Sequence, residues 1–268
     1  MNAIETYNLV QFYVDRTRGA RYYFSEINSA VNDAIKNTID DITDTVNANQ
    51  TSGIDRLQVF RDELYTLIKT ESSVPTVIGA YNSDVLINHI NYPTDYRTFV
   101  SMSCTIDGAT SYVRDLTYNN KGPVLDDSFL KPTNSKVKFL EDSTGLKLYR
   151  GTTGTISNAS LDYIKQPVAF NMGSEAQLID PGVGVLNPLE YYVAVEDSVV
   201  GSTFYATGTK FINPSANLIS GQVIPFNVLT PIELPIKTHA DVAKRAAAIL
   251  SGVVKNFESS GFAEKESM

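Results

Sequence analysis

The residues that most often carry out catalysis are few in this chain and far apart. His89 and His239 are its only histidines, and Cys104 is its only cysteine. A zinc site needs about four His, Cys or carboxylate ligands at short spacing, which these three residues do not supply. We therefore predict no metal site, and we expect both histidines to be structural. A lone cysteine also leaves no internal disulfide, which is typical of a reducing cytoplasm.

Other motifs that could support catalysis are incomplete. Asp126-Asp127 and Glu196-Asp197 are pairs of acids, and glycoside hydrolysis needs two acids on either side of one bond. Acids that are adjacent in a turn-rich sequence usually lie in solvent instead. Gly182-Val183-Gly184 lacks the third glycine and the helix of a dinucleotide-binding fingerprint, and no phosphate-binding loop or Gly-x-Ser-x-Gly motif occurs. We predict no catalytic residue and no cofactor, so we do not expect an enzyme.

One cluster of positive charge stands out in a predicted hairpin. Residues 136–140 and 146–150 alternate apolar with polar or basic residues, and the turn residues 141–145 separate them. Two interpretations stay open for the basic face, namely a solvated strand face and a surface that docks an acidic neighbour such as a second copy of the chain. The basic residues are Lys136, Lys138, Lys147 and Arg150.

The elements around this hairpin are also predicted to be short strands. Residues 100–106 alternate apolar with polar side chains, which makes Cys104 a core residue, and Asp107-Gly108 predicts a tight turn. The segment 161–168 is strand-like up to Pro167, which marks a strand end. Residues 190–195 and 202–207 are predicted to pair through Gly201. We expect an antiparallel β-sandwich or barrel-like domain over residues 73–235.

Helical periodicity is confined to the two ends of the chain. Apolar residues at three-and-four spacing predict helix from Thr6 to about Asn47, with a break near Gly19, and again from Ser52 to about Thr70. The short linker between them predicts a helical hairpin. Thr238 with Asp241 predicts the cap of a C-terminal helix. The fold class is therefore α+β, with a helical region 1–72 and a C-terminal helix and tail 236–268 that pack with the β domain as one unit.

Two parts of the chain are candidates for contact with a neighbouring subunit. The first is the apolar stripe of the C-terminal helix, including Val242, Ile249 and Val253. The second comprises residues 179–188 and 212–235, which are apolar but interrupted by Pro and Gly. These segments either lie against another subunit or line the core of their own chain, and both interpretations stay open.

Composition limits the class of partner. With 43% hydrophobic and 19% charged residues the chain is globular, and its net charge of -8 argues against a surface that binds nucleic acid through phosphate contacts. No run approaches the roughly 18 apolar residues that a membrane helix needs. Glu5 and Asp15 lie where a signal peptide would be basic and then apolar. We expect a soluble protein that is not exported and has no membrane partner.

Four short motifs between about residues 90 and 257 resemble a known family. They are Tyr92-Pro93-Thr94-Asp95-Tyr96-Arg97, Phe129-Leu130-Lys131-Pro132, the segment 161–167 and Glu233-Leu234-Pro235. Their order resembles virion structural proteins of tailed phages and, more narrowly, the neck or ring proteins of crAss-like podoviruses.

The resemblance implies a protein made in the host cytoplasm and located in the virion, at the neck or tail. It implies a homo-oligomeric ring of the head-to-tail connector or tail that lines or surrounds the DNA channel, of about twelve copies by the resemblance alone. Such a ring would contact portal, ring or tail proteins, and viral DNA would pass through it during ejection without specific binding. An acidic lumen would repel the phosphates of that DNA.

A second class of function remains open beside the ring. A β-sandwich can also recognise a glycan or a protein through aromatic loops, and Tyr191, Tyr192 and Tyr205 are the candidate contact residues in this chain. A glycan array would distinguish the two, because a clear signal favours the recognition module and silence favours the ring.

Overall fold

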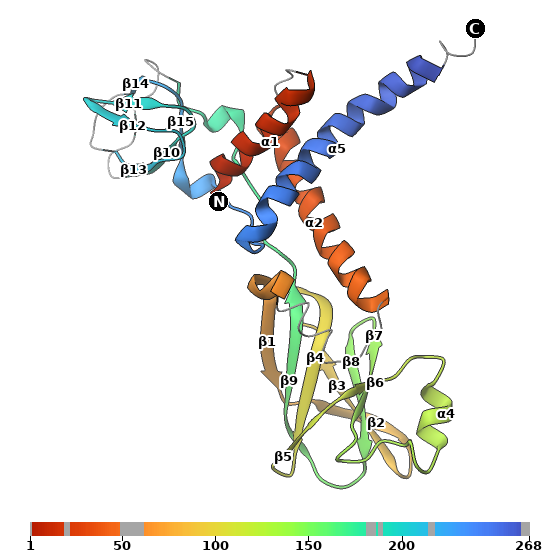
Figure 1. Ribbon diagram of the computed structural model, residues 1–268. Coiled ribbons are helices and arrows are strands. Elements are labelled where there is room, and N and C mark those ends of the chain that lie inside the picture. Colours follow the sequence, from red (N-terminus) through yellow and green to blue (C-terminus); the bar gives the residue numbers. More distant parts are fainter. Residues whose placement is uncertain are drawn as a thin grey trace. The chain divides into compact units, whose positions relative to one another are not determined.

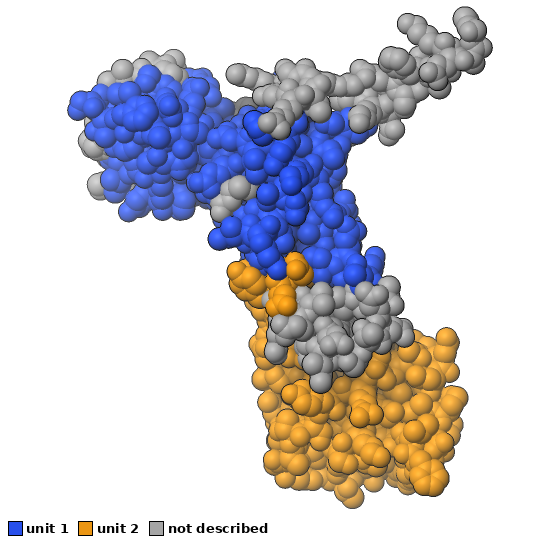
Figure 2. Space-filling view, viewed as in Figure 1, with its two compact units in different colours: residues 1–49, 167–268 blue, residues 50–166 orange. Residues whose placement is uncertain are grey.

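The chain forms two compact units, which Figure 2 colours separately. The computed structural model describes residues 2–18, 22–48, 62–180, 186, 190–213 and 218–263, and only the backbone of 15–18, 46–48, 175, 218–219 and 253–263. Unit 1 contains residues 1–49 and 167–268, and unit 2 contains residues 50–166. The predicted β domain 73–235 is therefore divided between two units, because the strands before residue 166 pair only among themselves.

Three helices form the larger part of unit 1. They are α1 (Ala3–Arg18), α2 (Phe24–Ala48) and α5 (Ile236–Ala263). Figure 1 shows α5 lying against both α1 and α2. The predicted break near Gly19 is confirmed, because α1 ends at Arg18 and α2 begins at Phe24. Their contact faces are apolar and include Ile4, Val10, Ile27, Val31, Ile35, Val242, Ala243, Ala246 and Leu250.

The ends of these helices follow local hydrogen bonding. At the start of α1, Asn2 Oδ1 accepts from the Glu5 backbone N–H, and Glu5 Oε2 accepts from the Asn2 N–H, each at 2.8 Å. The predicted cap of α5 at Thr238 is wrong, because the helix already begins at Ile236. Thr238 is buried in the first turn, where its Oγ1 donates to the Pro235 carbonyl at 2.8 Å.

The predicted helix from Ser52 to about Thr70 extends beyond the last helical residue in the structure. Residues 49–61, which include the linker and the predicted cap Ser52, lie outside the described residues. Residues 62–64 are helical, the 3-10 turn η1 (Tyr65–Leu67) follows, and strand β1 (Ile68–Ser73) begins next. Ile68 pairs with Ile164 and Ser73 with Ala159, so pairing with a distant strand overrides the helical pattern.

Unit 2 is a sandwich of two sheets, and it also contains the short helix α4 (Lys121–Asp126). The first sheet has the order β1, β9 (Ile156–Lys165), β4 (Tyr96–Ile106), β5 (Ala109–Tyr112). The second has the order β2 (Thr76–Asn82), β3 (Val85–Asn91), β8 (Gly145–Gly151), β7 (Lys138–Asp142), β6 (Arg114–Asp115). All neighbours are antiparallel except β6 and β7.

One apolar core joins the two sheets, which makes the domain a sandwich rather than a barrel. It takes Met102, Cys104 and Leu161 from the first sheet and Phe139 and Leu148 from the second. The α+β class with antiparallel sheets and helices at both ends of the chain is thus confirmed, as is Cys104 as a core residue.

Both predicted hairpin turns of unit 2 are present. Asp107 and Gly108 have φ angles of 50° and 82°, which the two-residue turn between β4 and β5 requires. Asp142 pairs with Gly145 across the turn between β7 and β8. Strand β9 ends at Lys165, just before Pro167, as the proline predicts.

Unit 1 carries two small sheets of short strands. The first has the order β13 (Lys210–Ile212), β10 (Tyr191–Ala194), β15 (Val223–Pro225), and the second has the order β12 (Thr203–Tyr205), β11 (Ser198–Val200), β14 (Leu218–Ser220). The predicted pairing of residues 190–195 with 202–207 is therefore wrong. Gly201, with a φ of 60°, forms the turn between β11 and β12 instead, because three residues on each side suffice for a short ladder.

The segment 212–235 lines the core of its own unit in several places. Val223, Ile224, Ile232 and Leu234 are buried, which agrees with the core-lining interpretation for these residues. Ile212 and the first residue of the 3-10 turn η3 (Phe226–Val228) remain exposed. Of residues 179–188, positions 181–185 and 187–188 lie outside the described part of the chain, and the 3-10 turn η2 (Glu175–Gln177) precedes them.

Candidate functional site

Strand β2 is the longest strand of unit 2 in which every residue is exposed. It lies at one edge of the five-stranded sheet, and all seven of its residues are exposed. Val77 and Ile78 are 59% and 53% exposed, although β2 is hydrogen bonded to β3 along its length. An apolar edge strand that is uncovered on both faces is a common contact surface for another protein chain.

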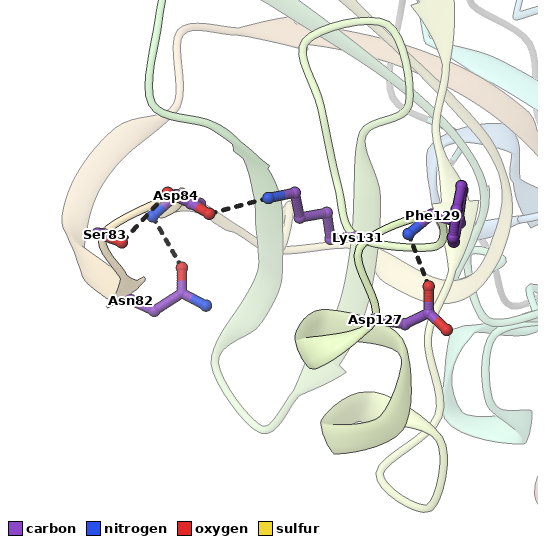
Figure 3. Close-up of polar contacts among 6 residues, drawn as sticks. All are labelled: Asn82, Ser83, Asp84, Asp127, Phe129 and Lys131. Carbon is purple, nitrogen blue, oxygen red and sulfur yellow. Dashed lines mark hydrogen bonds and ion pairs between the residues drawn. The ribbon is translucent and has the colours of Figure 1, made fainter.

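The loop after α4 adds further apolar side chains. Asp127 Oδ1 accepts hydrogen bonds from the backbone N–H groups of Phe129 and Leu130 at 2.6 and 3.0 Å, which fixes a tight turn. In Figure 3 the Phe129 ring points away from Asp127, and the ring is 87% exposed. We call the exposed residues Val77, Ile78, Tyr81, Phe129 and Leu130 the tip surface.

Polar contacts hold the parts of the tip surface together. Lys131 Nζ lies 2.8 Å from Asp84 Oδ2, and Asp84 also accepts from the Ser83 hydroxyl at 3.1 Å (Figure 3). The Asp84 N–H donates to Asn82 Oδ1 at 2.9 Å. The Lys131 ammonium and the Ser83 hydroxyl hold the pKa of Asp84 below its usual value. The turn between β2 and β3 is thereby tied to the loop that carries Phe129.

The four basic residues of the predicted hairpin face do not share one surface. Lys138 pairs with Tyr149 and Leu140 with Lys147, which places Lys138 and Lys147 on one face of the sheet and Arg150 on the other. Arg150 is only 3% exposed, and its Nε donates to Asn88 Oδ1 at 3.0 Å. The prediction of a single basic face is therefore wrong, because an odd spacing along a strand reverses the direction of the side chain.

The remaining three basic residues also differ in their surroundings. Lys147 Nζ lies 2.6 Å from Asp142 Oδ2, so its charge is neutralised within the hairpin. Lys138 is half-buried, and burial, followed by the nearby Arg114 guanidinium, lowers the pKa of its ammonium. Lys136 is exposed. Of the basic residues of the hairpin, Lys136 and Lys138 thus remain in contact with solvent, together with the neighbouring Arg114.

The three predicted contact residues of α5 are also separated by the structure. Val242 is completely buried in its own unit and cannot be reached by a neighbouring copy. Ile249 is half-buried and keeps part of its side chain in solvent. Val253 lies outside the residues whose side chains are described. Of the three, Ile249 is the one whose described side chain a neighbouring copy could contact, and its role in such a contact stays a prediction.

A large open groove lies in unit 2 between β4 and β5 of one sheet and β6 and β7 of the other. Its volume is about 1350 Å³. Phe99 and Phe139, which both line it, stack with ring centroids 4.4 Å apart, and the lining residue Tyr92 stacks on Tyr96 with centroids 4.1 Å apart. We call it the tyrosine groove, and its aromatic and charged lining residues are Tyr92, Phe99, Tyr112, Arg114, Asp115, Tyr118, Phe139, Glu141 and Asp142.

Glu141 is the polar centre of one part of the groove. Tyr96 donates its hydroxyl to Glu141 Oε1 at 3.1 Å, and Tyr118 donates to the Glu141 backbone carbonyl at 3.3 Å. Burial, and then the Glu141 charge, raises the pKa of Tyr92 to about 12, and the same two causes raise the pKa of Tyr96. These hydroxyls therefore stay protonated at neutral pH and can act as donors.

The other titratable residues are held in structural roles. His239 is buried with Nε2 2.7 Å from the Leu234 carbonyl, and His89 Nε2 lies 3.4 Å from Thr144 Oγ1. Asp197 accepts from the backbone and hydroxyl of Thr207. Burial raises the pKa of the Cys104 thiol to about 12, which makes it a poor nucleophile.

The described part of the chain contains neither a cluster of metal-ligating residues nor a helix that could cross a membrane. Its His, Cys, Asp and Glu residues form no group of three that could hold a metal ion. None of its helices combines the length and the apolar character that crossing a bilayer requires.

The tyrosines chosen from the sequence do not form one contact surface. Tyr192 is buried, and Tyr205 stacks on Phe211 with centroids 4.1 Å apart. Tyr191 is half exposed, with Lys210 Nζ 4.4 Å from its ring centroid. The three tyrosines that line the groove, Tyr92, Tyr112 and Tyr118, were missed, although Tyr112 lies in the second strand of the predicted hairpin and the other two flank that hairpin in the sequence.

Comparison with known proteins does not assign the chain to a family. No protein-family model matches the chain, and no curated protein matches it. The resemblance to phage neck proteins therefore stays a prediction.

Proposed function

We propose that the protein is a non-enzymatic structural subunit that assembles with copies of itself into a ring, at the head-to-tail connector or tail of a phage. The observation that carries the assembly part of this proposal is the tip surface, which leaves an apolar edge strand and the Phe129 loop uncovered. The phage setting comes from the sequence resemblance. Assembly can therefore be tested without reference to the phage setting.

The physical argument starts from how monomeric proteins protect sheet edges. Lysines, prolines, bulges and covering loops usually block pairing with another chain. The sequence of β2, Thr-Val-Ile-Gly-Ala-Tyr-Asn, contains no charge and no proline. Its register is irregular between Val77 and Gly79 and between Ala80 and Asn82. Because these irregularities disturb the backbone edge, we expect side-chain burial to contribute more to assembly than strand pairing.

Burial of these side chains favours a contact. Removing a Val, Ile or Phe side chain from water stabilises a complex by about 1.5–3 kcal/mol each. Several tip-surface residues would be covered at once in each contact. Repeated around a ring, the net charge of -8 per copy would also keep passing DNA from binding, because like charges repel.

Light scattering coupled to size-exclusion chromatography tests the assembly on the full chain. We expect an oligomer for the unmodified protein and a monomer for Ile78→Asp at the same concentration, with an unchanged circular dichroism spectrum. Ile236→Asp is the matched control, since Ile236 is equally apolar and 74% exposed but lies in unit 1. A monomeric wild type, or an Ile78→Asp oligomer of unchanged mass, contradicts the assignment of the tip surface.

The role of α5 in assembly needs a separate variant. Ile249→Asp places a charge on the half-buried side of α5. We expect a smaller oligomer if α5 contributes to the subunit contact. If Ile249→Asp folds and assembles like the wild type, α5 is not part of that contact, and the assembly rests on the tip surface alone.

A further inference from the structure

We propose that the tyrosine groove binds a small organic cation, with a quaternary ammonium head beside the Glu141 carboxylate and an apolar body on a pair of phenylalanine rings. Two tyrosines, Tyr92 and Tyr118, would face the head, and the phenylalanines are Phe99 and Phe139. This proposal does not depend on ring assembly, because the groove and the tip surface share no residue.

The first argument is the state of the Glu141 carboxylate. Glu141 is exposed at the end of β7, where it lines the groove. Tyr96 donates its hydroxyl to Glu141 Oε1 at 3.1 Å, which orients the carboxylate. Oε2 accepts no hydrogen bond from a described residue, and no described Lys or Arg forms an ion pair with Glu141. The carboxylate is therefore held in place and still available to the cation of a ligand.

The second argument is the pair of tyrosine rings near this carboxylate. Tyr118 is 68% exposed and donates its hydroxyl to the Glu141 backbone carbonyl at 3.3 Å. Tyr92 stacks on Tyr96, the residue that donates to the Glu141 carboxylate, with ring centroids 4.1 Å apart. The faces of tyrosine rings attract cations, and aromatic cages of this kind bind quaternary ammonium groups. Rings and carboxylate together favour such a head.

The third argument is the apolar surface that continues from the carboxylate into the groove. Phe99 and Phe139 stack on each other from opposite sheets, and Val100 and Met102 also line the groove. Pockets for small ligands usually measure about 300–1,000 Å³. The groove has a volume of about 1350 Å³, so it has room for an apolar body in addition to the head. A ligand with an aromatic ring next to its cation fits this surface.

The fourth argument is charge complementarity. The groove is lined by three carboxylates, Asp115, Glu141 and Asp142, and by one cation, Arg114. Lys147 already neutralises Asp142. Two carboxylates and one guanidinium remain, so the groove has a negative excess. A cleft with an excess of one charge concentrates ligands of the opposite charge, which favours a cation over an anion.

Two other occupants fit these observations less well. A neutral glycan could stack on the exposed tyrosines, but it would leave the Glu141 charge without a counterion. A lysine side chain of another protein carries three N–H donors that need acceptors, whereas the faces of the rings suit a head without donors. Both occupants are outcomes that the experiments below can detect.

Ligand-observed NMR titrations of the full chain test the charge of the head. Choline is compared with 3,3-dimethylbutan-1-ol, which has the same shape but a carbon atom in place of the charged nitrogen. We expect choline to bind at least about tenfold more tightly than this neutral analogue. Equal binding of the two overturns the proposal and indicates stacking without charge, as a glycan would show.

Two further probes test the body of the ligand and its source. Benzyltrimethylammonium should bind more tightly than choline, because its ring adds apolar area that the groove can cover. It should also bind more tightly than Nα-acetyl-lysine methylamide, which represents a side chain of another protein. No binding of benzyltrimethylammonium overturns the proposal. Tighter binding of the lysine derivative overturns it in favour of a protein partner.

Variants test the position of the head with benzyltrimethylammonium as the probe. Glu141→Gln keeps an acceptor for Tyr96 but lacks the charge, and we expect it to bind the probe about tenfold more weakly than wild type. Tyr118→Leu removes one ring and should weaken binding by about two- to fivefold. Equal affinity of Glu141→Gln and wild type, with thermal melts that show both folded, overturns the proposal.

Each variant has a matched control outside the groove. Glu71→Gln removes an exposed carboxylate from β1, in the other sheet of unit 2. Tyr23→Leu removes a tyrosine of unit 1 that is 67% exposed, close to the exposure of Tyr118. Both controls should bind the probe like wild type, and a loss of affinity in either equal to that of its counterpart contradicts the site. Because these readouts do not involve oligomer mass, they can fail or succeed independently of the assembly experiment.

Discussion

At the scale of single residues, burial decides what a charged side chain does. Arg150 carries a charge yet is almost completely buried, where its Nη1 donates to the carbonyls of Gly151, Thr153 and Gly154. A planar guanidinium with several fixed donors can hold a loop in this way, which a lysine cannot. Burial lowers the pKa of Arg150, although its group titrates far above neutral and stays charged. The residue therefore organises the loop after β8 rather than a docking surface.

Tyr149 provides a test at the same scale. Its ring is fully buried, and its hydroxyl has no hydrogen-bond partner among the described residues. A buried polar group without a partner costs about 1–3 kcal/mol. We expect Tyr149→Phe to leave the free energy of unfolding unchanged or to raise it by about 1–2 kcal/mol in urea titrations.

Tyr163→Phe is the control for Tyr149→Phe. The Tyr163 hydroxyl donates to Asp95 Oδ1 at 2.8 Å, so its removal should lower the free energy of unfolding by about 1–2 kcal/mol. A clear loss of stability in Tyr149→Phe would mean that the Tyr149 hydroxyl has a partner in solution.

His239 predicts a pH dependence of stability. Burial lowers the pKa of this imidazole below 6.5, and the hydrogen bond to Leu234 offsets the effect in part. Between the folded pKa and about 6.5 the unfolded chain binds a proton that the folded chain does not. The His239 contribution is thus complete above that pH and is lost as the pH falls through the folded pKa. We expect urea titrations to give a lower free energy of unfolding at pH 5 than at pH 7.

The His239→Leu variant should lose most of this slope, whatever its absolute stability. Asp84, Asp95 and Asp142 have pKa values below 3.8, so their contributions are lost at lower pH and do not overlap with this window. An unchanged slope in His239→Leu would assign the pH dependence to another group.

At the scale of elements, the close approach of β3 and β8 requires a glycine at position 145. A Cβ atom on Gly145 would collide with the backbone carbonyl oxygen of Ile90, because β3 and β8 approach closely there. A backbone atom cannot move aside as a flexible side chain can. We expect Gly145→Ala to lower the free energy of unfolding by at least about 2 kcal/mol in urea titrations.

Gly122→Ala is the matched control for this element. No described atom lies within 4 Å of a Cβ on Gly122, which belongs to the helix α4. Alanine favours helix over glycine, so this variant should be more stable than wild type by about 0.5–1 kcal/mol. Equal effects of the two substitutions would contradict the close approach at Gly145.

At the scale of the whole molecule, the chain passes from unit 1 into unit 2 and back. Each unit has buried apolar residues of its own, so each can melt as a cooperative block. We expect two transitions in differential scanning calorimetry of the full chain. Leu161→Ala should lower the melting temperature of the unit 2 transition alone, and Leu250→Ala that of the unit 1 transition alone. Each substitution should reduce the free energy of unfolding of its own unit by about 2–5 kcal/mol.

The two leucines make a matched pair because the same atoms are removed from each unit. Leu161 lies on β9 and Leu250 on α5, and both are buried. If either variant shifted both transitions equally, or if the wild type melted in a single transition, the two units would be energetically one.

The sequence alone was sufficient to predict the strands and helices that depend on patterns within a few neighbouring residues. Alternation at 100–106 with the Asp107-Gly108 turn predicted β4 and β5, and the break near Gly19 predicted two helices. Such signals depend on side-chain periodicity and backbone preferences within a few residues, so they are readable without the fold.

Only the tertiary structure decided what depends on distant partners. Ile68 became part of a strand because it pairs with Ile164, and Arg150 became buried beside Asn88. The tyrosine groove likewise combines two sheets whose order no local pattern specifies. The physical reason is that pairing and burial are set by contacts between residues far apart in the sequence, which the hydrophobic pattern permits but does not select.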